Sequence, residues 1–182
     1  RSTANDGGTK GTVLDNVVAV RGTSQALIAL TANGELYTWG KGTYTGTPSG
    51  SGATDRTYAT KMQNPATGKT PKMIGMTDIY TNAKLTYFVL MTDGTVYSMG
   101  DSSLKQLGTG STTSSASWVQ VKKSATANDF MTNIAWISPQ EHGGDTWSAN
   151  ISALTTDGKL YSWGGNSGQM LGGATNNIGY NP

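Results

Sequence analysis

The sequence has no cysteine, little charge and no long apolar run. The absence of cysteine excludes a disulfide framework and a thiolate metal site, although it leaves the cellular compartment open. Only 13% of the residues are charged and the net charge is +2, so nucleic-acid binding has little electrostatic support. No stretch of about 18 residues is continuously apolar, and the sequence therefore predicts no membrane-spanning helix.

Glycine is abundant by contrast, with 25 of the 182 residues, and Thr, Ser and Asn are also frequent. This composition is typical of short strands joined by many turns. The regular occurrence of Trp, Tyr, Val, Ile and Leu argues against disorder. Since no segment has helical periodicity of useful length, we expect an all-β fold.

Three segments of the chain are copies of one another, and each carries an Asn-Gly or Asp-Gly pair. The shared pattern is Thr-x-Asp-Gly-x-Leu-Tyr-x-Trp-Gly with small variations, at 29–40, 89–100 and 153–164. Gly34 and Gly94 lie 60 residues apart, and Gly94 and Gly158 lie 64 apart. A period of this length fits a propeller blade better than a helical repeat.

The Asx-Gly pairs predict hairpin turns, and the residues around them predict buried strands. A two-residue type I′ turn needs positive φ at both central residues, which Asn, Asp and Gly tolerate best. The flanking residues are apolar on both faces, as in a sheet that is covered on both sides. The predicted turn residues are Asn33, Gly34, Asp93, Gly94, Asp157 and Gly158.

Each repeat is expected to supply four short strands. Val- and Ile-rich runs that suit innermost strands precede the hairpins at 16–20, 77–81 and 133–138, and polar strands follow at 58–63 and 117–123. We expect one repeat domain over residues 1–182, with residues 1–15 a strand or linker from a preceding segment. The repeats would cover about 16–76, 77–132 and 133–182, the third incomplete unless a strand around 11–14 of another copy completes it.

The repeated core resembles the hallmark of regulator of chromosome condensation repeats. The family's Gly-Gln-Leu-Gly segment is matched by Gln106-Leu107-Gly108 and, with Met170 inserted, by Gln169 and Leu171-Gly172, whereas the first repeat lacks it. The family's Gly-x-x-His before the hairpin is also absent. The resemblance implies a partial β-propeller of about three four-stranded blades, because closed propellers of the family usually have seven. It further implies a rigid disc that binds proteins through its loops, which does not fix the function.

Catalytic and metal-binding patterns are missing. His142 is the single histidine, and we interpret the segment Glu141-His142-Gly143-Gly144-Asp145 as a polar loop rather than a metal site, because one His is a poor ligand set. No nucleophile-elbow motif surrounds a serine. We expect a protein that is not an enzyme and has no metal or cofactor.

The aromatic residues divide into packing and contact candidates. Trp39 and Trp163 are expected to pack between blades. Aromatics in loops can anchor an interface or hold down their own loop, and both interpretations stay open. The contact candidates are Tyr44, Tyr58, Trp147 and Tyr180.

An arc of three blades would expose one apolar blade face at each end, with Ile28, Leu36, Leu154 and Leu160 among the residues on them. We expect these faces to be covered by further repeats, neighbouring copies or another domain. The leading hypothesis is a non-enzymatic extracellular binding or scaffolding module of a bacterial surface, filament or virion. The alternatives are a self-assembling structural subunit and a protein-binding regulator, such as an enzyme inhibitor or an exchange factor.

The expected partner is a protein, a glycan or another copy of the chain, and not a nucleic acid. An extracellular or cell-surface location is expected from the lightly charged, Thr-rich, cysteine-free composition. The first residue, Arg1, leads us to expect a chain that was processed or cut from a longer one.

Overall fold

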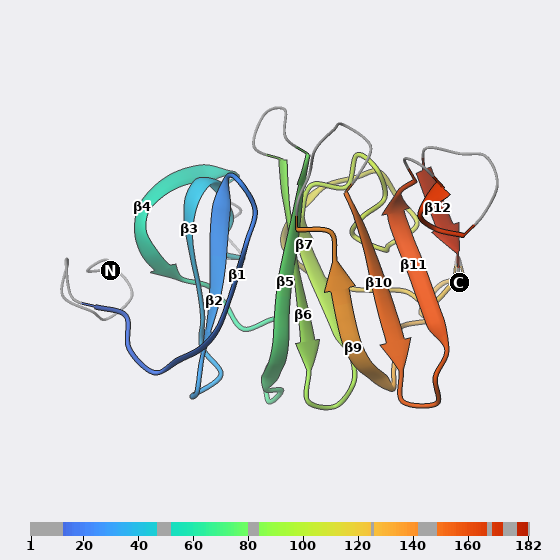
Figure 1. Cartoon of the computed structure of the whole chain (residues 1–182), viewed down its shortest axis with the longest axis horizontal. Coiled ribbons are helices and arrows are strands. Elements are labelled where there is room, and N and C mark those ends of the chain that lie inside the picture. Colours follow the sequence, from blue (N-terminus) through green and yellow to red (C-terminus); the bar gives the residue numbers. More distant parts are fainter. Residues whose placement is uncertain are drawn as a thin grey trace.

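The computed structural model describes residues 13–46, 52–79, 84–124, 126–141, 149–166, 169–172 and, for the backbone alone, 178–181. These residues form twelve strands and no α-helix, arranged as three antiparallel sheets of four strands each. The sheets stand side by side along the long axis of the molecule, in chain order from left to right (Figure 1). The all-β expectation and the expectation of about three four-stranded blades are confirmed.

Each sheet is a blade whose strands follow one another in chain order. Blade 1 consists of β1 (Val17–Gly22), β2 (Ala26–Thr31), β3 (Leu36–Thr43) and β4 (Thr54–Lys61). Blade 2 consists of β5 (Pro71–Ile79), β6 (Lys84–Met91), β7 (Val96–Gly100) and β8 (Ser115–Gln120). Blade 3 consists of β9 (Ile134–Pro139), β10 (Asn150–Thr155), β11 (Leu160–Gly165) and β12 (Ile178–Asn181).

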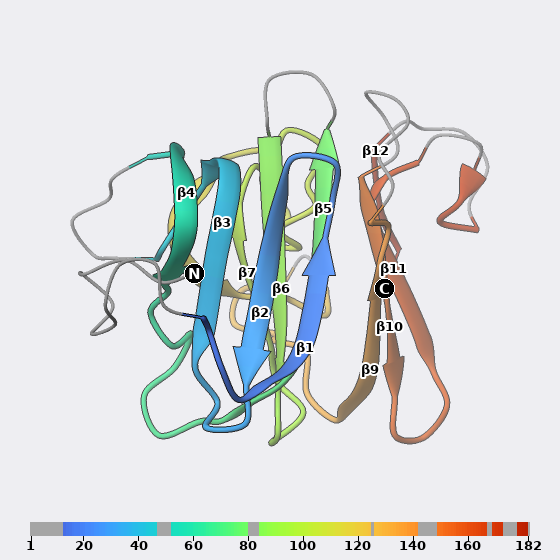
Figure 2. The same ribbon diagram turned by 60° about the vertical axis from the view of Figure 1, so that its left-hand side comes forward.

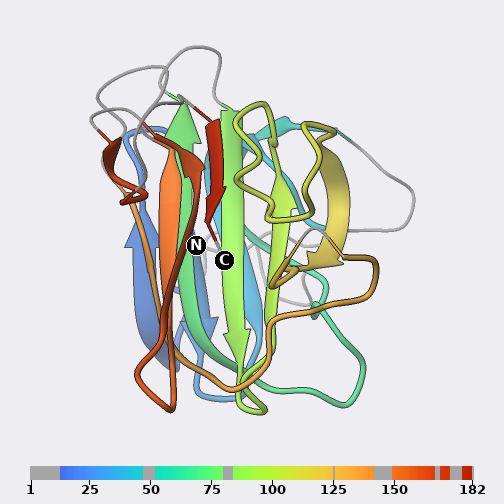
Figure 3. The ribbon, with the colours of Figure 1, turned by 90° about the vertical axis from the view of Figure 1, so that its right-hand side faces the viewer.

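The first strands of the blades lie along the inner side of the arc. Strand β5 contacts both β1 and β9. The hairpins β2–β3, β6–β7 and β10–β11 all turn at the same end of the molecule, at the bottom of Figures 1 and 3. Figure 2 shows blade 1 from its outer face, with blade 2 behind it.

Two expectations about the repeats are corrected. Strand β5 begins at Pro71 and therefore crosses the boundary expected between residues 76 and 77. Pro71 stands at the first position of the strand, where a proline is tolerated. A Cβ on Gly75 would lie 2.3 Å from Cγ of Pro139, so this glycine lets β9 approach. The third blade also has four strands, because β12 of the same chain pairs with β11.

The hairpin turns have the predicted glycine conformation but not the predicted type. The φ angles of Gly34, Gly94 and Gly158 are +78°, +81° and +84°, whereas the Asx residues before them are not in the positive-φ region. The amide of Gly34 donates to the carbonyl of Thr31 at 2.9 Å. Each connection is thus a three-residue loop, a type I turn followed by a left-handed glycine, and the type I′ expectation was wrong.

The core lies between the blades. Along β6, Leu85, Tyr87 and Val89 pack on blade 1, while Phe88 and Leu90 pack on blade 3, and all five are 0% exposed. Since side chains alternate along a strand, a sheet covered on both sides buries both sets of side chains. This burial explains the short apolar run Phe88–Met91 at the end of β6.

The glycine that ends each repeat motif is required by a close backbone approach. Gly40, Gly100 and Gly164 have φ angles of +116°, +119° and +99°. A Cβ at these positions would lie 2.1–2.5 Å from a carbonyl oxygen of the neighbouring strand β2, β6 or β10, or of the residue just before it. The glycine therefore allows the outer strands to turn away without opening the hairpin ladder.

Candidate functional site

The outer side of blade 3 carries a row of exposed apolar side chains. Trp136 on β9 is paired with Leu154 on β10, and Leu154 is paired with Leu160 on β11. Their exposed fractions are 56%, 40% and 66%. We call the side of this sheet that points away from blade 2 the blade-3 face. Three in-register apolar side chains across three strands form a continuous patch of the kind that marks an interaction site.

The corresponding rows of the other two blades are buried. In blade 2 the row is Met73, Leu90 and Val96, and it packs on blade 3. Leu90 and Val96 are both 0% exposed. In blade 1 the row is Ala19, Leu30 and Leu36, and it packs on blade 2. The blade-3 face is thus a surface of the inter-blade type on which no described blade lies.

The expected exposure of end residues is confirmed at one end of the arc and corrected at the other. Leu154 and Leu160 are exposed, as expected. Ile28 and Leu36 are 0% and 2% exposed, because they point into the interface between blades 1 and 2. Sequence position alone could not tell which side of the sheet each residue faces.

The hairpin tips differ between the blades in the same way as the apolar rows. A Cβ on Gly34 would lie 3.3 Å from Cγ2 of Thr70, just before the start of blade 2. A Cβ on Gly94 would lie 3.1 Å from the backbone of Asn133, and the Gly94 carbonyl accepts a hydrogen bond from the amide of Ile134 at 3.0 Å. Around Gly158 no atom of the described residues lies within 4 Å of such a Cβ. The tips of blades 1 and 2 thus touch the next blade, whereas no described atom lies against this position at the tip of blade 3.

The opposite end of the arc is partly covered. On the outer side of blade 1, Val18 and Val20 are 62% and 41% exposed. Further out on the same side, Ala29 and Tyr37 are buried in a small cluster that includes Leu14. The two ends of the arc are therefore not equivalent, and the larger bare apolar row belongs to blade 3.

Trp163 packs between blades 2 and 3, as predicted. Its side chain is 1% exposed, and its ring meets that of Phe88 edge-on with centroids 6.4 Å apart. The indole Nε1 donates to the carbonyl of Gln106 at 2.9 Å. Trp39, at the same repeat position in blade 1, is only half-buried and packs on the outer cluster of its own blade, so the prediction of inter-blade packing was wrong for Trp39.

The Gly-Gln-Leu-Gly segment has a structural role in blade 2. Gln106 is 0% exposed, and its Oε1 accepts from the amide of Leu104 at 2.8 Å while its Nε2 donates to Oδ2 of Asp101 at 2.9 Å. These bonds fix the carbonyl of Gln106 where Trp163 of the next blade reaches it. The motif thus joins neighbouring blades.

A pocket of about 170 Å³ lies on the inner side of the arc. All three blades contribute to it: Arg21 from β1, Met73 from β5, and Trp136 and Ser138 from β9, with Glu141 just after β9. Nε of Arg21 and Oε1 of Glu141 are 3.5 Å apart. Burial raises the pKa of Glu141, and the charge of Arg21 opposes that shift without cancelling it. We call this the axial pocket.

The aromatic contact candidates do not gather in one place. Tyr44 is half-buried against the cluster between blades 1 and 2, and burial raises the pKa of its hydroxyl. Tyr58 is half-buried in β4. The backbone of Tyr180 lies opposite Trp163 in β12. Trp147 lies outside the described residues, as does His142.

The residues of the blade-3 face and the axial pocket were not among the candidates. Trp136 lies in a strand that the sequence does predict, but its exposure depends on which side of β9 faces blade 2. Arg21 and Glu141 are 120 positions apart in the chain. Only the packing of β1 and β9 on the two sides of β5 brings them together.

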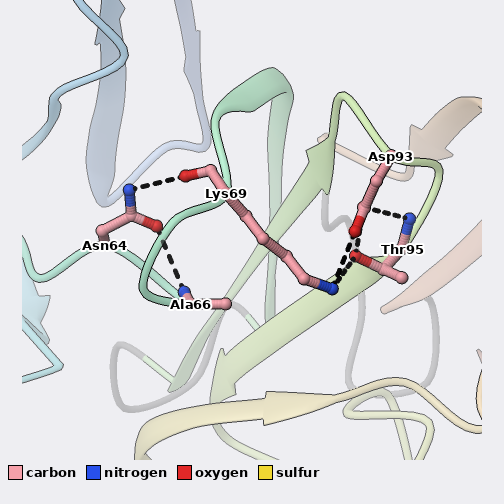
Figure 4. Close-up of polar contacts among 5 residues, drawn as sticks. All are labelled: Asn64, Ala66, Lys69, Asp93 and Thr95. Carbon is pink, nitrogen blue, oxygen red and sulfur yellow. Dashed lines mark hydrogen bonds and ion pairs between the residues drawn. The ribbon is translucent and has the colours of Figure 1, made fainter.

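A polar clamp holds the connection between blades 1 and 2 (Figure 4). Asn64 folds the connecting loop by accepting from the amide of Ala66 at 3.1 Å and donating to the carbonyl of Lys69 at 3.0 Å. Nζ of Lys69 then reaches Oδ2 of Asp93 at 2.8 Å and Oγ1 of Thr95 at 3.1 Å. The hydrogen bonds from Lys69 and Thr95 lower the pKa of Asp93 to about 2. Asp93 thus has a second role beyond its turn.

Within the described residues, no group of three or more His, Cys, Asp and Glu side chains lies close enough to hold a metal ion. The same part of the chain includes no helix with the length and apolar character needed to cross a membrane.

Comparison with known proteins identifies the fold. No protein-family model matches the sequence, and no curated protein matches it. Among solved structures, human WBSCR16 has 18% identity and a TM-score of 0.59 over 85% of this chain. Yeast RCC1 (Prp20) bound to Kap60 has 15% identity and a TM-score of 0.63 over 92% of it. Prp20p from Saccharomyces cerevisiae, described with its binding to Gsp1p and histones, has 16% identity and a TM-score of 0.62 over 92%.

The chain spans only 34–37% of the length of these three structures. At such low identities the likeness concerns the fold, which agrees with the repeated motif, the blade topology and the burial between blades. The chain has the fold of regulator of chromosome condensation repeats, as an arc of three β-propeller blades.

Proposed function

We propose that this chain is a non-catalytic protein-binding and scaffolding module, and that its blade-3 face docks a further blade of the same repeat type. One observation carries the proposal: the row Trp136, Leu154 and Leu160 is exposed, whereas its counterparts in the other two blades are buried by the next blade. The hairpin tip at Gly158, where no described atom lies within 4 Å of an added Cβ, supports the same occupant, because the other two tips touch the next blade.

The physical gain from docking is the removal of apolar surface from water. Each square ångström buried contributes about 25 cal/mol, and a fully buried leucine contributes roughly 2 kcal/mol. Two leucines and a tryptophan in one patch therefore supply several kcal/mol before the entropy of association is subtracted. In the isolated chain the available blade is that of a second copy.

Size-exclusion chromatography with light scattering tests the proposal on the isolated chain. At micromolar concentration we expect association, and we expect the double variant Leu154→Ser/Leu160→Ser to be monomeric with an unchanged circular dichroism spectrum. Val13→Ser is the matched control, because Val13 is 81% exposed but lies outside the row. A wild-type chain that is monomeric and monodisperse at these concentrations would contradict the proposal.

The setting proposed for this module is extracellular or on a cell surface, within a bacterial surface, filament or virion assembly. Support comes from composition alone: no cysteine, 13% charged residues and a high content of threonine. The Prp20p structures, described with Kap60, Gsp1p and histones, support proteins as the class of partner. No described side-chain cluster points to an inhibitor or exchange-factor role. Surface labelling of intact source cells, followed by detection of the labelled chain, tests the location.

A further inference from the structure

One glycine in each blade lies at the place where the next blade can insert a tryptophan. A Cβ on Gly46 of blade 1 would lie 2.9 Å from Nε1 of Trp118, which belongs to β8 of blade 2. A Cβ on Gly108 of blade 2 would lie 2.9 Å from Nε1 of Trp163 in blade 3. Around Gly172 of blade 3, no described atom lies within 4 Å of such a Cβ. We call the surface at this glycine the indole position of a blade.

The indole comes from a different part of the incoming blade at the two occupied positions. Trp163 is the motif tryptophan of blade 3, whereas blade 2 has Met99 at that place in the motif and supplies Trp118 from its outermost strand. Nε1 of Trp118 donates to the carbonyl of Gln63, just after blade 1, at 2.8 Å. Nε1 of Trp163 donates to the carbonyl of Gln106 in blade 2 at 2.9 Å. Two tryptophans from different strands thus place an indole N–H at the same position, which indicates that the position itself selects this side chain.

The turn that carries the indole position has the same conformation in blades 2 and 3. In blade 2, Lys105 has a φ of +61°, and its carbonyl accepts from the amide of Gly108 at 3.0 Å. In blade 3, Gln169 has a φ of +63°, and its carbonyl accepts from the amide three residues later, also at 3.0 Å. Met170 therefore takes the place of Gln106 and is not an insertion. Its carbonyl is the acceptor that corresponds to the one used between blades 2 and 3.

The outer side of blade 1 has the side chains of a surface that receives a preceding blade. Trp39 occupies the motif position of Trp163 and packs on the side of blade 1 that points away from blade 2. The paired row on this side, followed by the row that blade 3 turns toward blade 2, is Val20, Ala29 and Tyr37, then Ile137, Ala153 and Tyr161. Val20 is 41% exposed, whereas Ile137 is 3% exposed. The same kind of surface is thus covered in blade 3 and partly open in blade 1.

Leu14 covers part of this side within a single copy. It packs on the cluster of Ala29 and Tyr37, which are 0% and 7% exposed. Leu14 lies before β1 and belongs to no strand, so its displacement by an incoming blade breaks no strand pairing. Val20 and the half-buried Trp39 are accessible without that displacement.

On the basis of the proposed function, we infer that copies of the chain join head to tail. The blade-3 face of one copy meets the outer side of blade 1 of the next copy. The ring of Trp39 then lies against Gly172, and its Nε1 donates to the carbonyl of Met170. This contact is heterologous because it joins two different surfaces, so a copy that is damaged on one surface keeps the other.

Mixing two complementary variants tests the head-to-tail contact. Trp39→Ala disables the outer side of blade 1 and keeps the blade-3 face, whereas Leu154→Ser/Leu160→Ser does the reverse. In analytical ultracentrifugation, at a concentration at which the wild-type chain associates, we expect each variant alone to be monomeric and their equimolar mixture to form a dimer. A contact between two blade-3 faces would instead let Trp39→Ala associate with itself and would give no dimer with the double variant.

Substitutions at the glycine and at the indole test the predicted atoms. Gly172→Ala places a Cβ where the indole nitrogen would lie, and we expect it to raise the dissociation constant about ten-fold or more. Gly110→Ala is the matched control, because its φ of +81° is close to the +77° of Gly172 and no described atom lies within 4 Å of its Cβ. It should leave the dissociation constant unchanged. Trp39→Phe keeps an apolar ring and loses the N–H donor, so it should raise the constant several-fold without a change in the circular dichroism spectrum.

The possible results distinguish the head-to-tail contact from the docking of a blade in general. A wild-type chain that stays monomeric overturns both. Association that persists in Trp39→Ala, the absence of a dimer in the mixture of complementary variants, or equal dissociation constants for Gly172→Ala and Gly110→Ala overturns the head-to-tail contact alone.

Discussion

Trp163 is predicted to contribute more to the stability of the folded chain than Trp39, the tryptophan at the same position of the first repeat. The ring is 1% exposed between blades 2 and 3, and its Nε1 donates a hydrogen bond to the carbonyl of the fully buried Gln106. Replacing a buried Trp by Ala typically costs about 3–5 kcal/mol. The more conservative Trp163→Phe keeps the apolar contact with Phe88 but leaves the Gln106 carbonyl unpaired, at a cost of about 1–3 kcal/mol.

Trp39 provides a matched control because it occupies the same position of the repeat. It is half-buried on the outer side of blade 1, and no described blade lies beyond it. We expect Trp39→Ala to cost clearly less than Trp163→Ala, and Trp39→Phe to cost less than about 1 kcal/mol. Urea unfolding followed by circular dichroism gives the free energies. Equal losses at the two positions would refute the view that inter-blade burial, and not the motif itself, makes this tryptophan important.

Three further predictions concern glycines and pH. Gly94→Ala should cost more than Gly158→Ala, although their φ angles are +81° and +84°, because a Cβ on Gly94 meets the start of β9 at 3.1 Å and one on Gly158 meets nothing. Thermal unfolding of the two variants measures the difference, and equal costs would contradict it. Gly100→Ala should prevent folding or cost more than about 3 kcal/mol, because its Cβ would lie 2.1 Å from a backbone carbonyl, whereas Gly110→Ala, with open space, should cost only about 1–2 kcal/mol through its positive φ. Soluble yield and urea midpoints distinguish these outcomes. The pKa of Asp93 in the folded chain is about 2, below the ordinary 3.8, so its stabilising effect is present above about pH 4 and is lost as the pH falls toward 2. Because the side chain is 44% exposed, we expect a loss of less than about 1 kcal/mol. Asp93→Asn should be less stable than the wild-type chain at pH 7 and nearly equal to it at pH 2, and a constant difference across this range would contradict the assignment.

The repeated motif determines the blades, because its requirements are local. An Asx-Gly pair between two apolar runs forms a hairpin whatever surrounds it, and three copies in phase predict three sheets. At the final glycine of the motif, an added Cβ would clash with the backbone at or just before the neighbouring strand of the same blade. The requirement for glycine at this position is therefore also local. The run Phe88–Met91, apolar at every position, already indicates burial on both sides of a sheet.

Other features depend on which way a strand faces and on what stands next to it. The sequence places Leu36 and Leu160 at the same position of the repeat, yet one is 2% and the other 66% exposed, because a blade covers the first and not the second. The boundary of the second repeat was misplaced because the inner strand was expected at 77–81, whereas β5 already begins at Pro71. The pairing of Arg21 with Glu141 has no signal in the sequence, since it arises from side chains 120 positions apart on two blades.

The sequence alone therefore determined the β-hairpins, the repeat and the number of blades, all of which rest on turn geometry and alternation within about 20 residues. The tertiary structure alone decided which faces are buried, that Trp163 and not Trp39 joins two blades, and that a neutral pocket forms on the inner side of the arc. These depend on contacts between repeats about 60 residues apart, and the same residue type at the same repeat position has a different environment in each blade.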